Sequence, residues 1–145
     1  MLRRDHRILV SLVCATLSCG CSHLSADRTW KGGREALTAY VGEWKNEDLN
    51  SRNIARVIIA LPTDRPDNPS IHVWGKCGSR ECDLGLLTGA RHRNAIVAIS
   101  NDRFATSTLT LSLQRDGHLN VDSQRHFSDS SGRPDYEVSE HFVKQ

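Results

Sequence analysis

Residues 105–127 read ATSTLTLSLQRDGHLNVDSQRHF, and this stretch decides the fold. Apolar and polar residues alternate on both sides of Arg115-Asp116-Gly117. Such alternation is typical of strands that bury one face, and an Asp-Gly step between two of them indicates a β-hairpin. The stretch therefore predicts two adjacent antiparallel strands.

The length of this hairpin loop follows from the residues that would oppose each other. A two-residue Asp-Gly turn would place Leu113 opposite Asn120, although directly opposed residues share one face of a sheet. A three-residue loop with Gly117 in the left-handed conformation places Leu113 opposite Leu119. We expect the three-residue loop, because both leucines then face the core.

The same strand character continues on either side of this hairpin. Residues 62–69 hold three of the four prolines and are expected to form a loop, and residues 35–40 could form a short N-terminal helix. The predicted strands are 41–46, 53–61, 70–76, 82–88, 94–99, 105–114, 118–127 and 136–143. Eight strands with short turns predict an all-β fold, either an antiparallel up-and-down barrel or a strongly curled sheet. A two-sheet sandwich is the alternative.

The chain begins with an expected export signal at residues 1–20. A short basic segment precedes ten residues of mainly apolar character, 8–17, which as a helix would span only about 15 Å and are too short to cross a bilayer. Without residues 1–20 the formal charges balance, so the strong positive charge typical of nucleic-acid binding is missing. We expect no nucleic-acid partner.

Gly20-Cys21-Ser22 resembles the lipobox of bacterial lipoproteins, in which a small residue precedes the cysteine that receives the lipid. The resemblance implies lipid attachment at Cys21, with Cys19 as the second choice, and a tether at residues 21–34 before one domain at residues 35–145. Since no Asp follows Cys21, it also implies the outer membrane as destination, with the domain facing the periplasm. Plain secretion of a soluble protein is the alternative.

Cys77 and Cys82 remain after the signal and the lipid-acceptor cysteine are set aside. An even number of cysteines in an oxidising compartment predicts a disulfide. A metal site that includes His72 or Asp83 is the alternative, but a single cysteine pair is a poor zinc signature. A four-residue loop would oppose the two cysteines directly, and the same register would pair Trp74 with Gly85.

In the last hairpin we expect Phe127 opposite Tyr136. This register places Arg125 diagonal to Glu140, on the inward face that Glu140 shares with Tyr136 and Phe142. An inward charge pair is either a structural clamp or a group that faces a ligand.

Gly42-Glu43-Trp44-Lys45-Asn46 resembles the G-x-W-x-N start of calycin-type barrels, the lipocalins and avidins. That resemblance implies that Trp44 packs at one end of the barrel against a basic side chain from a late strand, a role that Arg125 could fill. Residues 74–85 are similar to the W-G-x-C-x4-C-D-W-G signature of a family of small secreted or membrane-associated domains, with Leu84 in place of the second Trp. This resemblance supports the fold and the disulfide.

No residue set indicates an enzyme, a cofactor or a metal. The five histidines from His72 onward lack metal-ligand spacing, no G-x-S-x-G elbow is present, and the acids near the C-terminus do not converge on one face. We expect a non-enzymatic envelope lipoprotein; an enzyme without a recognisable motif is the weakest alternative.

Two kinds of binding remain open. In the first, a small apolar or amphipathic ligand lies in the barrel, as in a secreted lipocalin-like protein. In the second, an envelope protein partner binds the hairpin at residues 77–82 and the loop at residues 62–69. The many inward leucines suggest a filled interior, because a small domain has little apolar mass to spare for a cavity. The expected ligand-binding residues are Trp44, Arg125, Tyr136 and Glu140, joined by Val121 and Phe142 in the apolar wall.

Overall fold

The computed structural model describes residues 33–145. The expected export signal, Cys21 and most of the tether lie outside these residues. One helix, α1 (Gly33–Thr38), precedes eight strands: β1 (Gly42–Asn46), β2 (Ile54–Ala60), β3 (Ser70–Cys77), β4 (Arg80–His92), β5 (Ala95–Asn101), β6 (Ala105–Leu113), β7 (Leu119–Phe127) and β8 (Tyr136–Lys144). The helix begins two residues before its predicted start. In this part of the chain no helix combines the length and the apolar character needed to span a bilayer.

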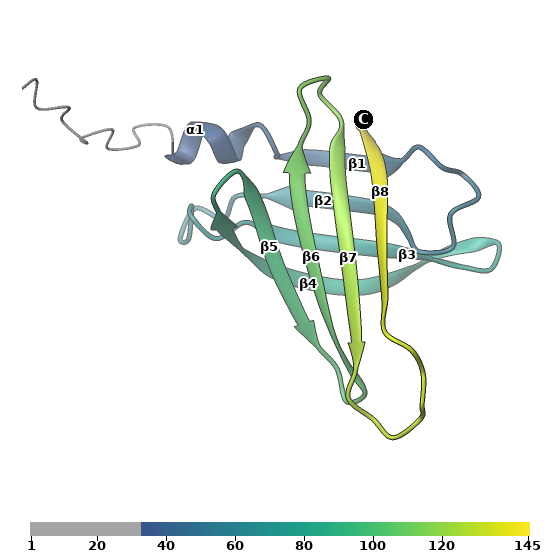
Figure 1. Cartoon of the computed structure of the whole chain (residues 1–145). Helices are drawn as coiled ribbons and strands as arrows, with labels where there is room; N and C mark the ends of the chain where they lie inside the picture. The colour runs from purple at the N-terminus through teal and green to yellow at the C-terminus, as the bar shows by residue number, and fades with distance from the viewer. Residues whose placement is uncertain (1–32) are drawn as a thin grey trace, which may run out of the picture.

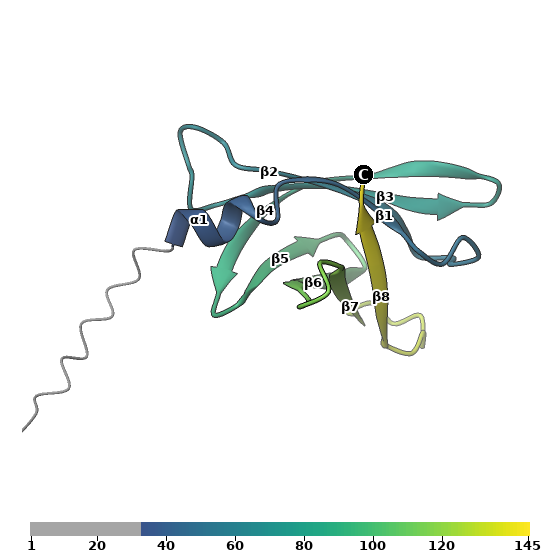
Figure 2. The same cartoon turned by 90° about the horizontal axis from the view of Figure 1, so that it is seen from above.

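The strands form a closed antiparallel barrel in sequence order, which confirms the predicted fold class (Figure 1). Seen from above, β1–β3 face β6–β8 across the interior (Figure 2). Helix α1 and the β2–β3, β4–β5 and β6–β7 connections lie at one end, which we call the closed end. The other four connections, including residues 128–135, lie at the opposite, open end.

The β6–β7 hairpin has the predicted register. Leu113 lies opposite Leu119, and the backbone at Gly117 is left-handed, with φ of 89°. The amide of Gly117 donates to the carbonyl of Gln114, which closes the turn. The need to keep both leucines on one face was therefore a sufficient guide to the loop.

The predicted register of the β3–β4 hairpin is wrong. Cys77 lies opposite Arg80 rather than Cys82, because the connection is a two-residue turn in which Gly78 takes a positive φ. The disulfide nevertheless forms, diagonally between Cys77 and Cys82, with their Cα atoms 5.7 Å apart. A bulge follows at residues 83–85, where Gly85 has φ of 108°, and it changes the register between the two strands.

The predicted register of the β7–β8 hairpin is wrong by two residues. Arg125, rather than Phe127, lies opposite Tyr136, and Glu140 lies opposite Val121. The inward and outward faces are unchanged, because a slip of two residues preserves strand alternation. Arg125 is consequently four residues away from the partner of Glu140, and the expected diagonal contact between them is not formed.

Trp44 anchors the filled half of the barrel near the closed end. It is 1% exposed, and its indole Nε1 donates to the carbonyl of Tyr40 at 2.8 Å. Lys144 on β8, with Nζ 5.2 Å from the ring centroid, supplies the basic side chain that the resemblance implies, a role that Arg125 does not fill. Glycine suits position 42 beside it, since its φ of 139° is a backbone conformation that other residues rarely adopt.

The rest of this half is packed with apolar side chains. Leu37 from α1 closes the end, and the Tyr40 hydroxyl donates to the Asn94 carbonyl across it. The buried residues around Trp44 are Val57, Ile59, Ile71, Ile96, Leu111, Leu119, Val121 and Phe142. This half of the interior matches the expected filled core.

Candidate functional site

The open half of the barrel is hollow, in contrast to the expected filled interior. A cavity of about 380 Å³, which we call the mouth cavity, opens at the open end. Its volume is within the range of small-molecule sites in proteins, near the lower limit. Its lining residues are Asn53, Ile54, Val73, Leu84, Leu87, Ser100, Asp102, Ser107, Leu109, Ser123, Gln124, Arg125, Tyr136 and Val138.

The walls of the mouth cavity are mainly apolar. Val73, Leu109 and Val138 come from three different strands, β3, β6 and β8, and belong to the inward alternation of each. Ser123 lies directly between Leu109 and Val138 in the sheet. Its hydroxyl oxygen is buried and has no hydrogen-bond partner among residues 33–145. Because such a hydroxyl costs stability, its position is better suited to a cavity than to a packed core.

An ion pair lies at the rim of the mouth cavity. Arg125 donates from Nη2 to Asp102 Oδ2 at 2.6 Å and from Nη1 to Ser107 Oγ at 2.9 Å. The other carboxylate oxygen of Asp102 accepts the backbone amides of Phe104 and Ala105, each at 2.8 Å. These backbone hydrogen bonds, together with Arg125, lower the pKa of Asp102 below its usual range.

The structure brings together two of the four predicted ligand-binding residues. Arg125 and Tyr136 are neighbours across the β7–β8 ladder and both line the mouth cavity. Trp44 does not line it, because its ring is enclosed in the filled half. The same holds for Val121 and Phe142.

Glu140, the fourth predicted residue, makes contacts that hold the barrel together. Its buried carboxylate accepts hydrogen bonds from Asn46 Nδ2 at 2.9 Å, from the Ile54 amide at 3.3 Å and from the Ser51 hydroxyl. These partners belong to β1, β2 and the connection between them, whereas Glu140 belongs to β8. The carboxylate therefore fastens the β1–β2 connection to β8, whereas the expected charge pair with Arg125 is not formed.

The residues of the W-G-x-C-x4-C-D signature also have structural roles. On the outer face, Trp74 stacks with Arg56, whose Cζ is 3.9 Å from the ring centroid, and with His72. Asp83 accepts from the Gly85 amide at 2.7 Å and pairs with His72 Nε2 at 2.8 Å, which fixes the bulge. The contact with His72 is the main cause of the lowered pKa of Asp83. This cluster stabilises the disulfide hairpin.

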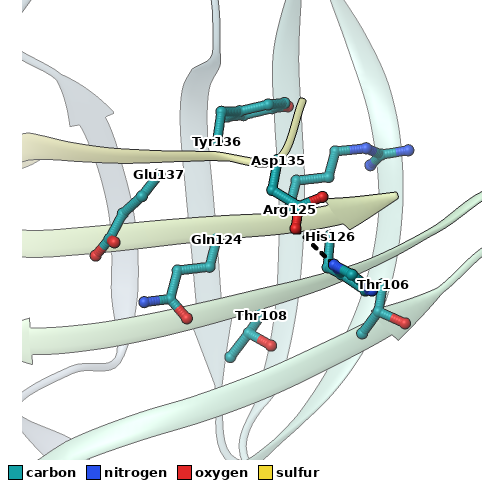
Figure 3. A pocket seen from close by; sticks show the side chains of 8 residues that line it. All are labelled: Thr106, Thr108, Gln124, Arg125, His126, Asp135, Tyr136 and Glu137. Carbon is teal, nitrogen blue, oxygen red and sulfur yellow. Dashed lines mark hydrogen bonds and ion pairs between the residues drawn. The ribbon is translucent and has the colours of Figure 1, made fainter. Parts of the chain in front are cut away.

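A second hollow of about 390 Å³ lies on the outer face of β6, β7 and β8 (Figure 3). In this view Arg125 and Tyr136 are directed to one side of the strands, and Gln124 and Glu137 extend to the other. His126 Nδ1 lies 2.6 Å from Asp135, but both side chains are more than half exposed. Asp135 also accepts the Phe127 amide. The pair is a solvated contact that closes the β7–β8 loop.

Sequence reasoning missed Asp102, Ser107 and Ser123 at the mouth. Asn101-Asp102 was visible as a turn signal between two strands, but its contact with Arg125 depends on the shape of the β5–β6 turn. Within residues 33–145, no three His, Cys, Asp or Glu side chains are grouped so as to hold a metal ion. Comparison with protein-family models, curated proteins and solved structures gave no match to this chain.

Proposed function

We propose that this chain is a lipid-anchored protein of the cell envelope whose barrel binds a small, largely apolar molecule in the mouth cavity. The observation that carries the proposal is the cavity itself: a packed half supports a hollow half whose wall combines six aliphatic side chains and Tyr136 with seven polar or charged residues. Rigid, mostly apolar cavities with a few placed polar side chains are typical of small-molecule sites.

The position of the expected anchor is compatible with an accessible mouth. Helix α1 lies at the closed end, so the chain that leads back to Cys21 joins the barrel there (Figure 1). Cys21 precedes Gly33 by twelve residues, which could span about 40 Å at most if extended. A lipid at Cys21 would therefore be attached through the end of the barrel that lies away from the mouth.

Binding is proposed in preference to catalysis. The charged groups at the mouth, Asp102 and Arg125, are paired with each other. The buried carboxylate of Glu140 is engaged by three donors, and Glu140 is not among the residues that line the cavity. A general acid or base has to reach the reacting group, and these carboxylates are already committed to structural contacts.

Native mass spectrometry tests ligand binding directly. The chain from residue 22 onward keeps every described element, and it should be purified from the periplasm with its disulfide intact. A retained small molecule is expected in the native chain and in Ser139→Trp, whose new side chain points outward. Val138→Trp places the same side chain in the mouth cavity and should lose it. Equal retention by the two variants would refute binding in the cavity.

Metabolic labelling with palmitate tests the anchor. We expect Cys21→Ala to abolish the label and Cys19→Ala to retain it. The reverse pattern would move the attachment site to Cys19, and an unlabelled native chain would refute the lipoprotein proposal in favour of plain secretion.

A protein partner is the second candidate function, and the distribution of exposed apolar residues favours it. Leu49, Leu84, Phe104 and Tyr136 are between 45% and 82% exposed and lie at the open end. A photocrosslinking residue at position 104 should then capture one defined envelope protein, whereas one at position 115, at the closed end, should not. Equal capture from both positions would argue against a partner at the mouth.

A further inference from the structure

We propose that the Asp102–Arg125 ion pair makes the mouth cavity selective for uncharged ligands. This inference rests on the proposed binding function and names the chemical class of its ligand: an apolar body without a carboxylate, phosphate or sulfonate.

The pair neutralises the charge of the site at its rim. Asp102 and Arg125 are the two charged residues among those that line the mouth cavity, and they contact each other at 2.6 Å. The remaining lining side chains are apolar or neutral and polar. A charged ligand would lose hydration on entry and would meet no unpaired opposite charge. An uncharged ligand loses much less, so it is favoured.

Asp102 holds Arg125 more firmly than an ordinary surface carboxylate would. Two backbone amides bind its Oδ1 and fix the side chain on the β5–β6 turn, and Oδ2 is left to face the guanidinium. Ser107 restrains the other end of the guanidinium. An anionic ligand would have to displace a carboxylate that the backbone already holds in place.

This division between the two oxygens of Asp102 allows a selective variant. In Asp102→Asn, the amide oxygen can keep both backbone hydrogen bonds at the Oδ1 position. The amide nitrogen then replaces Oδ2 and turns a donor toward a donor on Arg125. The variant therefore keeps the structure of the turn, while Arg125 loses its carboxylate partner and becomes an unpaired cation beside the cavity.

Two fluorescent probes with the same aromatic body measure the selectivity. N-phenyl-1-naphthylamine is uncharged, and 8-anilino-1-naphthalenesulfonate carries one negative charge. We expect the native chain to bind the uncharged probe at least about tenfold more tightly. We expect Asp102→Asn to tighten the sulfonate probe by about tenfold or more, the effect of one new charge-assisted hydrogen bond, and to leave the uncharged probe within about threefold.

Asp129→Asn is the matched control. Asp129 pairs with Arg133 in the β7–β8 loop in a similar way, but neither residue lines the mouth cavity. This variant should leave both affinities unchanged. Asp102→Ser, whose hydroxyl can accept a backbone amide in the same turn, repeats the test if Asp102→Asn does not fold.

The outcomes separate this inference from the function on which it rests. The selectivity would be overturned if the native chain bound the two probes equally, or if neither Asp102 variant bound the sulfonate more tightly. The proposed function would still stand in that case, provided that Val138→Trp abolished binding of the uncharged probe. If Val138→Trp had no effect on that probe, the cavity would not be its site, and the proposed function would fail together with the inference.

Discussion

Trp44→Ala should be among the most destabilising single substitutions in the barrel. The Trp44 side chain is almost completely buried in the filled half, and Lys144 covers its ring. Replacement by alanine removes the largest buried side chain and leaves a void among neighbours that cannot fully collapse. It also leaves the Tyr40 carbonyl without its indole donor. Substitutions of this kind cost about 3–5 kcal/mol.

The expected change is large enough to measure by thermal unfolding. Residues 33–145 would unfold with an entropy of about 240 cal/mol/K, which makes 1 kcal/mol equivalent to about 4 °C in Tm. Trp44→Ala should therefore lower Tm by about 12–20 °C. Far-ultraviolet circular dichroism is the suitable assay, because tryptophan fluorescence changes with the substitution itself.

Trp74→Ala provides the matched control. Trp74 lies on the outer face of β3, where Arg56 and His72 stack on it. Its loss removes a cation–π contact and part of a surface cluster, and we expect a cost of about 1–2 kcal/mol. Equal destabilisation by the two substitutions, or a fall of less than about 5 °C for Trp44→Ala, would refute the assignment of Trp44 as the anchor of the filled half.

Three further predictions follow from local contacts. Replacing both Cys77 and Cys82 with serine should lower the free energy of unfolding by about 2 kcal/mol, since the disulfide closes a short loop. A reductant should then lower the stability of the native chain only. A native chain whose stability does not change with reductant would contradict this prediction. Ser123→Val should raise the free energy of unfolding by about 1 kcal/mol in urea titrations, because it removes a buried hydroxyl without a partner; a loss would show that the hydroxyl is satisfied. The contact with Asp116 raises the pKa of His118 above 6.5. The stabilisation from this pair is therefore complete below the unfolded-state pKa and is lost as the pH rises through the raised value. An NMR titration of His118 with a midpoint at or below 6.5, or a midpoint that Asp116→Asn leaves unchanged, would contradict this prediction.

Strand alternation and short turns predicted an all-β barrel or a strongly curled sheet, but alternation did not determine every register within it. At the β6–β7 hairpin, one residue of slip would have turned Leu113 or Leu119 outward, so the pattern selected the three-residue loop over the two-residue turn. At the β7–β8 hairpin, a slip of two residues keeps every side chain on its own face. Alternation could not distinguish Arg125 from Phe127 as the partner of Tyr136, and the predicted contact between Arg125 and Glu140 failed for this reason.

The β3–β4 register depended on a backbone feature that alternation does not reveal. Gly85 was read as a small residue beneath Trp74, whereas its positive φ forms a bulge. The disulfide was still predicted, because it rested on the number of cysteines and on their compartment. The mouth cavity was not, since Leu109, Ser123 and Val138 face inward whether the barrel is full or hollow. Whether the interior is full or hollow at these residues depends on their position along the barrel axis and on the side chains that lie opposite them.

The residues of the two sequence motifs have roles in the fold, and the mouth cavity is lined mainly by other residues. Leu84 is the exception. Leu84 stands where the W-G-x-C-x4-C-D-W-G signature has its second tryptophan, and it lines the mouth cavity. It lies over Gly75, where a β-carbon would come within 2.8 Å of Leu84 Cδ1. A tryptophan at this position would take up much of the space that leucine leaves open.

Leu84→Trp should therefore weaken binding of N-phenyl-1-naphthylamine. It should keep Tm nearly unchanged, because Leu84 is 55% exposed. Unchanged binding would mean that position 84 lies at the rim without controlling entry, and that the width of the mouth is set by the Asp102–Arg125 pair and Tyr136.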